Sequence, residues 1–118
     1  MTADRATLAT IADNIFEAEK THRLLAPISE SYPDLSPEDC YAVQNMYVAR
    51  KLADGDAIAG YKVGATGAAS QAKFGVTEPV YGHMFKSGRV ETGASVPFAA
   101  RVHPIIECEL GLRLGKEL

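Results

Sequence analysis

The sequence predicts an α+β fold, in which a helical first half precedes a β-rich second half. Apolar residues recur at helical spacing between Asp4 and His22, whereas short apolar runs punctuated by glycine dominate after residue 56. The composition of 118 residues, 47% hydrophobic and 23% charged, is typical of a single folded domain with a core. We therefore expect an N-terminal helical region over 1–56 and a β-rich region over 57–118.

Two amphipathic helices are expected in the first region. The first runs from Asp4 to about His22 and places apolar side chains on one face: Leu8, Ile11, Ala12, Ile15 and Phe16. A polar, extended connector is expected from Ile28 to Leu35, and it leads to the second helix. That helix begins at Ser36-Pro37, because serine is a good N-cap and proline is tolerated in the first helical turn. It ends near Gly55, and its inner stripe comprises Cys40, Val43, Met46 and Tyr47.

The second region is predicted to begin with a buried strand over 57–64, whose glycines allow close approach of a ligand or another backbone. A short helix over 66–75 ends at Gly75. Two short strands are expected around the turn at 86–89 and the turn at Gly93, and a final strand covers 103–114.

Lys62 stands out inside the apolar run at 57–64. A lysine in such a run must extend its ammonium group to solvent, pair with a carboxylate, or work with a lowered pKa in a desolvated site. The sequence leaves these three outcomes open, and extension to solvent is the commonest of them.

Glu107 and Glu109 lie two residues apart in the final apolar run. In a strand they share one face, about 7 Å apart, while Cys108 faces the other way. Two carboxylates so close repel each other unless a cation lies between them, and hard oxygen ligands favour Mg²⁺, Mn²⁺ or Ca²⁺. The alternative is a solvated face of an amphipathic strand, because Glu-x-Glu is a common pattern.

The composition argues against several classes of function. Twelve basic and fifteen acidic residues give a net charge of −3, with no long block of either sign, so nucleic acid is a poor candidate partner. The sequence shows no membrane-spanning run and no secretory leader, and we therefore expect a cytoplasmic protein. Cys40 and Cys108 are expected to be reduced core residues.

A set of motifs occurs in a fixed order after residue 40. They are Tyr41-Ala42-Val43-Gln44, Gly60-Tyr61-Lys62-Val63-Gly64-Ala65-Thr66, Gln71, Gly75-Val76-Thr77-Glu78-Pro79-Val80-Tyr81-Gly82 and Glu107-Cys108-Glu109-Leu110. Together they resemble the 2-keto-4-pentenoate hydratase and 4-oxalocrotonate decarboxylase group of the fumarylacetoacetate hydrolase superfamily. The resemblance implies part of a mixed β-sandwich roll after the N-terminal helices, incomplete at the C-terminus.

The resemblance also implies a divalent-metal lyase that uses Mg²⁺ or Mn²⁺. Glu107 and Glu109 match the metal-binding Glu-x-Glu, Lys62 matches the active-site lysine, and Thr66 and Glu78 are candidate substrate-binding residues. The implied reaction adds water to 2-hydroxy-2,4-dienoate or 2-oxo-4-enoate acids of aromatic catabolism. The alternatives are decarboxylation of 4-oxalocrotonate-type 2-oxo acids and carbon–carbon cleavage of acylpyruvates. All three reactions share a metal-stabilised enolate.

Three departures from the family pattern bear on this interpretation. Val80 stands where many hydratases carry Asp, so a carboxylate that could relay a proton is missing, and this favours decarboxylation. Ala65-Thr66-Gly67 stands where Leu-Thr-Ser is common. Family members also continue well beyond this length, and the later part supplies the third carboxylate ligand. We therefore expect either a truncated chain or a half domain that pairs with another copy. A non-catalytic oligomerising domain is the competing hypothesis, so whether this chain alone is an enzyme is left open.

Overall fold

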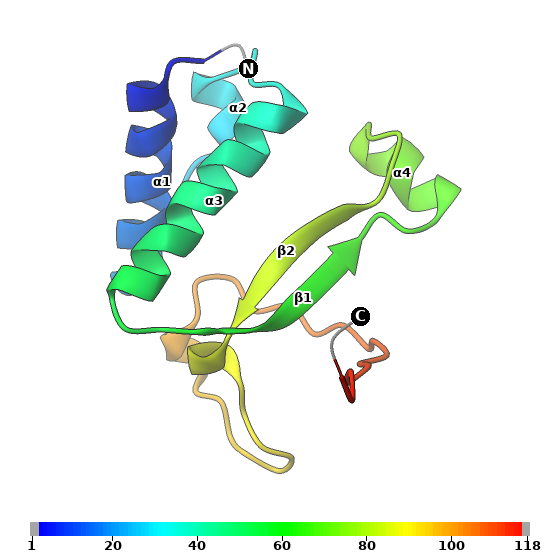
Figure 1. The fold of residues 1–118 in the computed structure, drawn as a ribbon. Coiled ribbons are helices and arrows are strands. Elements are labelled where there is room, and N and C mark those ends of the chain that lie inside the picture. The colour runs from blue at the N-terminus through cyan, green and yellow to red at the C-terminus, as the bar shows by residue number, and fades with distance from the viewer. Residues whose placement is uncertain (1–2, 117–118) are drawn as a thin grey trace.

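The computed structural model describes residues 3–116, and its elements confirm the predicted α+β class (Figure 1). The elements are α1 (Arg5–Lys20), α2 (Ile28–Ser31), α3 (Pro37–Ala53), β1 (Ile58–Gly64), α4 (Ala68–Phe74) and β2 (Val80–Phe85). Single 3-10 turns follow at Lys86–Gly88 and Phe98–Ala100. The helices α1 and α3 lie side by side, and the strand pair lies beside α3 and runs from below its C-terminal end towards α4 (Figure 1).

The core lies between α1 and α3, as the helical spacing predicted. Its buried members are Leu8, Ile11, Ala12 and Val43. The first helix begins where expected, because the Asp4 carboxylate accepts a hydrogen bond from the Thr7 N–H at 2.9 Å. Arg50 of α3 joins the two helices by donating to the Ala9 carbonyl at 3.1 Å and by pairing with Asp13.

The predicted start of α3 is confirmed by a capping box at Ser36 and Asp39. The Asp39 N–H donates to Ser36 Oγ at 3.2 Å, and the Ser36 N–H donates to Asp39 Oδ2 at 3.0 Å. The expectation of two core thiols is wrong, since Cys40 and Cys108 are both exposed. Cys40 lies in the first turn of α3, and Cys108 lies in a segment without helix or strand.

The strands β1 and β2 form an antiparallel pair, in which Lys62 lies opposite Gly82 and Tyr61 opposite His83. A bulge interrupts the pairing between Ile58 and Gly60. The strand predicted over 57–64 is present, but it is not buried: Tyr61 is 62% exposed, because within residues 3–116 no second sheet covers this pair. The predicted stop of α4 is confirmed, since Gly75 adopts the left-handed conformation at φ +68°.

Two contacts hold the strand pair against α3. At one end, the Asp56 carboxylate accepts hydrogen bonds from the Ser87 hydroxyl at 2.5 Å and the Ser87 N–H at 3.2 Å, and it pairs with Lys51 of α3 at 3.2 Å. At the other end, the Tyr41 and Tyr81 rings stack with their centroids 4.9 Å apart. The position of β1 relative to α3 is therefore fixed at both ends of the sheet.

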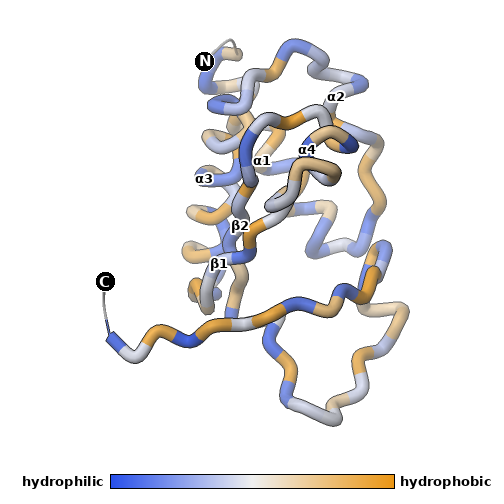
Figure 2. Tube along the Cα trace, turned by 90° about the vertical axis from the view of Figure 1, so that its right-hand side faces the viewer, coloured by the Kyte–Doolittle hydropathy of each residue, from blue (hydrophilic) through white to orange (hydrophobic). Residues whose placement is uncertain are grey.

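The segment 101–116, the last part that the structure describes, contains neither helix nor strand. It runs as an extended chain away from the turn at Phe98–Ala100 (Figure 2). The prediction of a strand over 103–114 is therefore wrong, as is that of a strand directly after the 86–89 turn. A strand needs a hydrogen-bonded neighbour, and the two described strands pair with each other alone.

Candidate metal and proton-transfer site

The C-terminal segment passes beside β1 and brings two carboxylates to Lys62 (Figure 1). Lys62 Nζ lies 2.9 Å from Glu107 Oε2, and it also donates to Glu109 Oε1. The ammonium is thus held by two residues that follow it by 45 and 47 positions in the sequence. The structure therefore brings together three of the five residues that the sequence singled out.

Local geometry explains why both glutamates reach one point. An extended backbone turns alternate side chains to opposite sides, so residues two apart share a side even where no ladder forms. Across the strand pair, Gly82 lies opposite Lys62 and adds no side chain beside the lysine stem. The site is open to solvent, with the Lys62, Glu107 and Glu109 side chains 42%, 60% and 50% exposed.

The two carboxylates set the protonation of the lysine. Hydrogen bonds that Lys62 donates, first to Glu109 and then to Glu107, raise the pKa of Lys62 above its ordinary value of 10.5. Of the three outcomes open for this lysine, the structure shows pairing with carboxylates. At neutral pH Lys62 is accordingly protonated and carries a positive charge.

The donor set fits a hard divalent cation in its chemistry. Two carboxylates that contact a common nitrogen atom can also converge on one small cation, for which carboxylate oxygens are the preferred ligands. Within residues 3–116 no group of three or more His, Cys, Asp and Glu side chains is close enough to hold a metal ion. Glu107 and Glu109 would therefore supply two protein ligands, with other groups or water completing the coordination shell.

The two candidate substrate-binding residues lie apart from this cluster. Thr66 and Glu78 are both exposed, and neither makes a hydrogen bond or ion pair with Lys62, Glu107 or Glu109 in the described chain. Thr66 lies in the connection between β1 and α4, which Gln71 closes by donating to the Ala65 carbonyl at 2.9 Å. The structure does not bring these two residues to Lys62.

An aromatic cluster on the strand pair was not predicted as a unit. The His83 ring lies 5.0 Å from the Tyr61 ring and 6.2 Å from the Tyr81 ring. His83 Nδ1 is buried and has no hydrogen-bond partner among the described residues. Tyr81 and His83 alternate along one strand, and this spacing was the available signal, but their neighbour Tyr61 follows only from the strand register.

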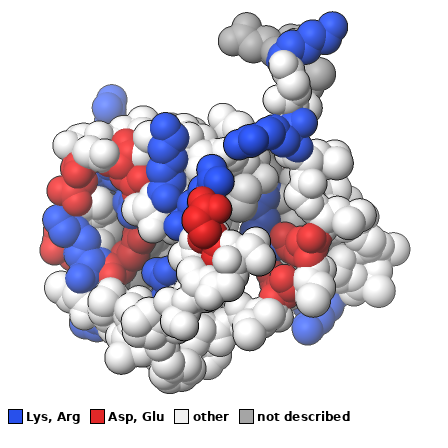
Figure 3. Space-filling model, turned by 90° about the horizontal axis from the view of Figure 1, so that it is seen from below, with Lys and Arg blue, Asp and Glu red and all other residues white. Residues whose placement is uncertain are grey.

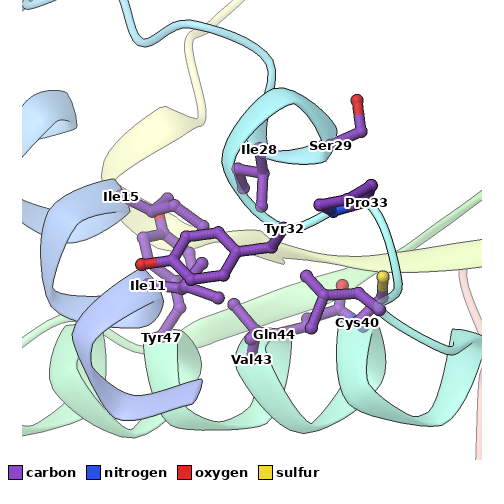
Figure 4. Close-up of a pocket in the computed structure, with 11 residues that line it drawn as sticks. Ile11, Ile15, Ile28, Ser29, Tyr32, Pro33, Cys40, Val43, Gln44 and Tyr47 are labelled. Carbon is purple, nitrogen blue, oxygen red and sulfur yellow. The ribbon is translucent and has the colours of Figure 1, made fainter. Parts of the chain in front are cut away.

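An apolar cavity of about 370 Å³ lies between the three N-terminal helices (Figure 4). Ile11 and Ile15 of α1, Tyr32 after α2 and Val43 of α3 point towards it (Figure 4). Its polar lining consists of hydroxyl, thiol and amide groups, without a carboxylate, lysine or histidine among its lining residues. The cavity therefore offers no carboxylate, lysine or histidine, the groups that most often transfer protons at neutral pH or hold a metal.

The surface charges agree with the balanced composition of the sequence. On the face shown in Figure 3, acidic and basic side chains are interspersed. Among the helices of the described residues, none is both long enough and apolar enough to span a bilayer.

The chain is homologous to one part of the sequence of several enzymes named as hydratases and decarboxylases of small oxo acids. It is 36% identical over 115 residues to the 2-oxo-hept-4-ene-1,7-dioate hydratase of Escherichia coli, covering 98% of this chain and 43% of the relative. The 2-keto-4-pentenoate hydratase of Paraburkholderia xenovorans is 29% identical over 91% of this chain and 40% of its own length. The 4-oxalocrotonate decarboxylase of Pseudomonas sp. strain CF600 is 33% identical over 92% of this chain and 41% of its own length.

Solved structures give the same result. The 4-oxalocrotonate decarboxylase of Pseudomonas putida G7, complexed with magnesium and adipate, matches with a TM-score of 0.70 and 31% identity over 73% of this chain and 33% of its own. A second structure of that enzyme, complexed with calcium and acetate, matches equally well. No family model matches the chain. The resemblance to the hydratase and decarboxylase group is confirmed, and the chain spans less than half the length of these three curated relatives.

Proposed function

We propose that this chain carries the metal-binding and proton-transfer residues of a divalent-metal-dependent hydratase for 2-hydroxy-2,4-dienoate or 2-oxo-4-enoate acids of aromatic catabolism. The observation that supports this most strongly is the convergence of Lys62, Glu107 and Glu109, which lie far apart in the sequence. Relatives named as hydratases, at 29% to 36% identity over nearly the whole chain, support the substrate class. Magnesium or calcium in the similar solved structures supports a divalent metal.

Each residue of the cluster has a distinct task in this proposal. Glu107 and Glu109 hold Mg²⁺, or Mn²⁺ as the alternative, which when bound supplies positive charge for the oxygens of a 2-oxo acid. Lys62, which is protonated in the cluster, donates a proton from Nζ to the substrate once it is released from the two carboxylates. Thr66 and Glu78 are proposed to contact the substrate carboxylate and its far end, respectively. Cytoplasmic location and assembly into a homo-oligomer remain predictions from the sequence.

Decarboxylation of a 4-oxalocrotonate-type acid is the second candidate. Val80, at the start of β2, cannot relay the proton that an acidic side chain would carry to the far carbon of the substrate. The two solved structures compared above are both of a 4-oxalocrotonate decarboxylase. The two reactions are separated by measuring carbon dioxide release from a 4-oxalocrotonate-type acid and water addition to a 2-hydroxy-2,4-dienoate.

The test of the proposed site is the loss of metal-dependent turnover. Replacing either Glu107 or Glu109 with Gln removes a metal-binding charge while keeping the side-chain size. We expect Mg²⁺-dependent turnover of 2-hydroxypenta-2,4-dienoate to fall about a hundredfold or more in each variant. Glu91→Gln is the matched control, because Glu91 is exposed and pairs with Arg89 away from the cluster. Turnover that stays at the control level in both variants would remove the metal assignment and leave a non-catalytic domain as the better account.

A further inference from the structure

The Lys62 ammonium occupies the point on which the two carboxylates converge. It contacts Glu107 Oε2 at 2.9 Å and also Glu109 Oε1, and in the described chain its ion pairs are with these two residues. In the absence of any other cation, the lysine therefore neutralises the repulsion that two adjacent carboxylates would otherwise experience. The protein supplies its own counter-ion for this acidic pair.

A divalent cation cannot join this arrangement without changing it. A metal such as Mg²⁺ binds carboxylate oxygens at about 2.0 to 2.1 Å, so a metal held between Glu107 Oε2 and Glu109 Oε1 needs the space that the ammonium now occupies. An ammonium and a dication held by the same two side chains would also repel each other strongly at such short range. Metal and ammonium are thus alternative occupants of one position.

The surroundings of Lys62 allow the ammonium to leave. Its side chain is 42% exposed, and the residue opposite it in the sheet is Gly82, which has no side chain to confine the lysine stem. A lysine stem has several rotatable bonds, so its ammonium can move into solvent or towards a bound substrate while its backbone stays in β1.

We propose that the Lys62 ammonium is an internal competitor for the metal, so that binding of a divalent cation to Glu107 and Glu109 and release of Lys62 from them are one event. This proposal rests on the proposed function of the site and adds its regulation: the metal frees the proton-donating group. Replacing an ordinary residue of a metal site weakens metal binding, and the proposal predicts the opposite for Lys62. Removing Lys62 should strengthen metal binding while removing its proton donor.

The experiment measures metal affinity directly, with no substrate present. Mg²⁺ binding is followed by titration calorimetry and Mn²⁺ binding by electron paramagnetic resonance of the free ion. We expect Lys62→Met to bind both metals about tenfold more tightly than the unsubstituted protein, because one positive charge next to the metal is lost. Lys73→Met removes the same charge from an exposed lysine outside these ion pairs, and its affinity should stay within about twofold of the starting value.

Further variants separate the possible outcomes. Lys62→Gln should reproduce the gain if Lys62→Met folds poorly, and circular dichroism checks the fold of both. When Glu107 and Glu109 are both Gln, Lys62→Met should no longer raise the affinity. If the unsubstituted protein binds metal and neither Lys62 variant binds more tightly than Lys73→Met, competition by Lys62 is overturned while the metal site stands. If no variant binds either metal, the proposed function itself fails.

Discussion

At the residue scale, Asp56 controls how the end of α3 is joined to the strands. It accepts hydrogen bonds from the Ser87 hydroxyl and N–H and from the Ala57 N–H, and it pairs with Lys51. The bond from Ser87, followed by the other donors, lowers the pKa of Asp56 well below its ordinary value of 3.8. Asp56 therefore remains ionised in the folded chain at pH values that protonate it in the unfolded chain.

This lowered pKa predicts a specific dependence of stability on pH. A carboxyl group with a lower pKa in the folded state stabilises it above the unfolded pKa, and this contribution is lost as the pH falls below about 4. Asp4 and Asp13 also have lowered pKa values and contribute in the same direction. We expect Asp56→Asn to lose less free energy of unfolding than the unsubstituted protein between neutral pH and a pH of about 3.

The measurement is urea unfolding at neutral and acidic pH, with Ser87→Ala as a second variant that removes the strongest donor to Asp56. It should show an intermediate pH dependence. Ser95→Ala, which replaces an exposed serine, is the control and should follow the unsubstituted protein. If Asp56→Asn and the control lost the same free energy of unfolding between neutral and acidic pH, Asp56 would not couple protonation to folding.

The candidate site was only partly accessible from residue patterns. Spacing alone places Glu107 and Glu109 on one side of an extended chain, but no local pattern says that Lys62, 45 residues before Glu107, lies between them. The similarity to a known family supplied that connection as a hypothesis, and the roles of these residues stay predictions. Tyr61 beside His83 was missed because cross-strand neighbours depend on the register, which single-strand alternation does not determine.

At the scale of elements, α1, α3 and α4 were predictable because their signals are local, whereas the single turn of α2 lies in the connector that was predicted to be extended. Asp4 and Ser36 accept hydrogen bonds within one turn, and the apolar spacing of α1 directly produces the buried stripe at Leu8 and Ile11. The segment 103–114 was mispredicted because a strand depends on a partner that local sequence does not reveal. Alternation of apolar residues indicates an extended backbone and does not guarantee a ladder.

The capping box of α3 gives a prediction at this scale. Ser36→Ala removes the side-chain acceptor for the Asp39 N–H and should lower the free energy of unfolding by about 1 kcal/mol, because that N–H then lacks its partner. Thermal unfolding followed by circular dichroism should show a decrease in Tm of about 4 °C. Ser95→Ala serves again as the exposed control. An unchanged Tm in Ser36→Ala would mean that water replaces the hydroxyl without loss.

At the scale of the whole molecule, the exposed apolar side chains of the C-terminal segment are the feature least typical of a monomer. Ile106, Leu110 and Leu112 are 95%, 99% and 94% exposed, and they follow one another along an extended chain that forms no ladder among the described residues. Such a segment can add to the edge of a sheet or pack against another apolar surface. Burying it would remove a large apolar area from water.

We therefore expect this chain to self-associate as its concentration rises. Sedimentation velocity across a series of protein concentrations measures the effect. Replacing both Leu110 and Leu112 with Ser should shift the distribution towards monomer, because the contact loses apolar area. Leu24→Ser, which changes a leucine that is 71% exposed at a distant place in the sequence, should not. A chain that remains monomeric at every concentration would contradict this prediction and the expected homo-oligomer.

The two contacts that fix the strand pair to α3 have a consequence for motion. With the Asp56–Ser87 bonds at one end and the Tyr41–Tyr81 stack at the other, the backbone that carries Lys62 moves with α3 as one rigid unit. The backbone that carries Glu107 and Glu109 has neither a ladder nor a helix to stiffen it. We therefore expect the backbone of the two acids to be more mobile than the backbone of β1, so that changes in the cluster involve the acidic segment and the Lys62 side chain.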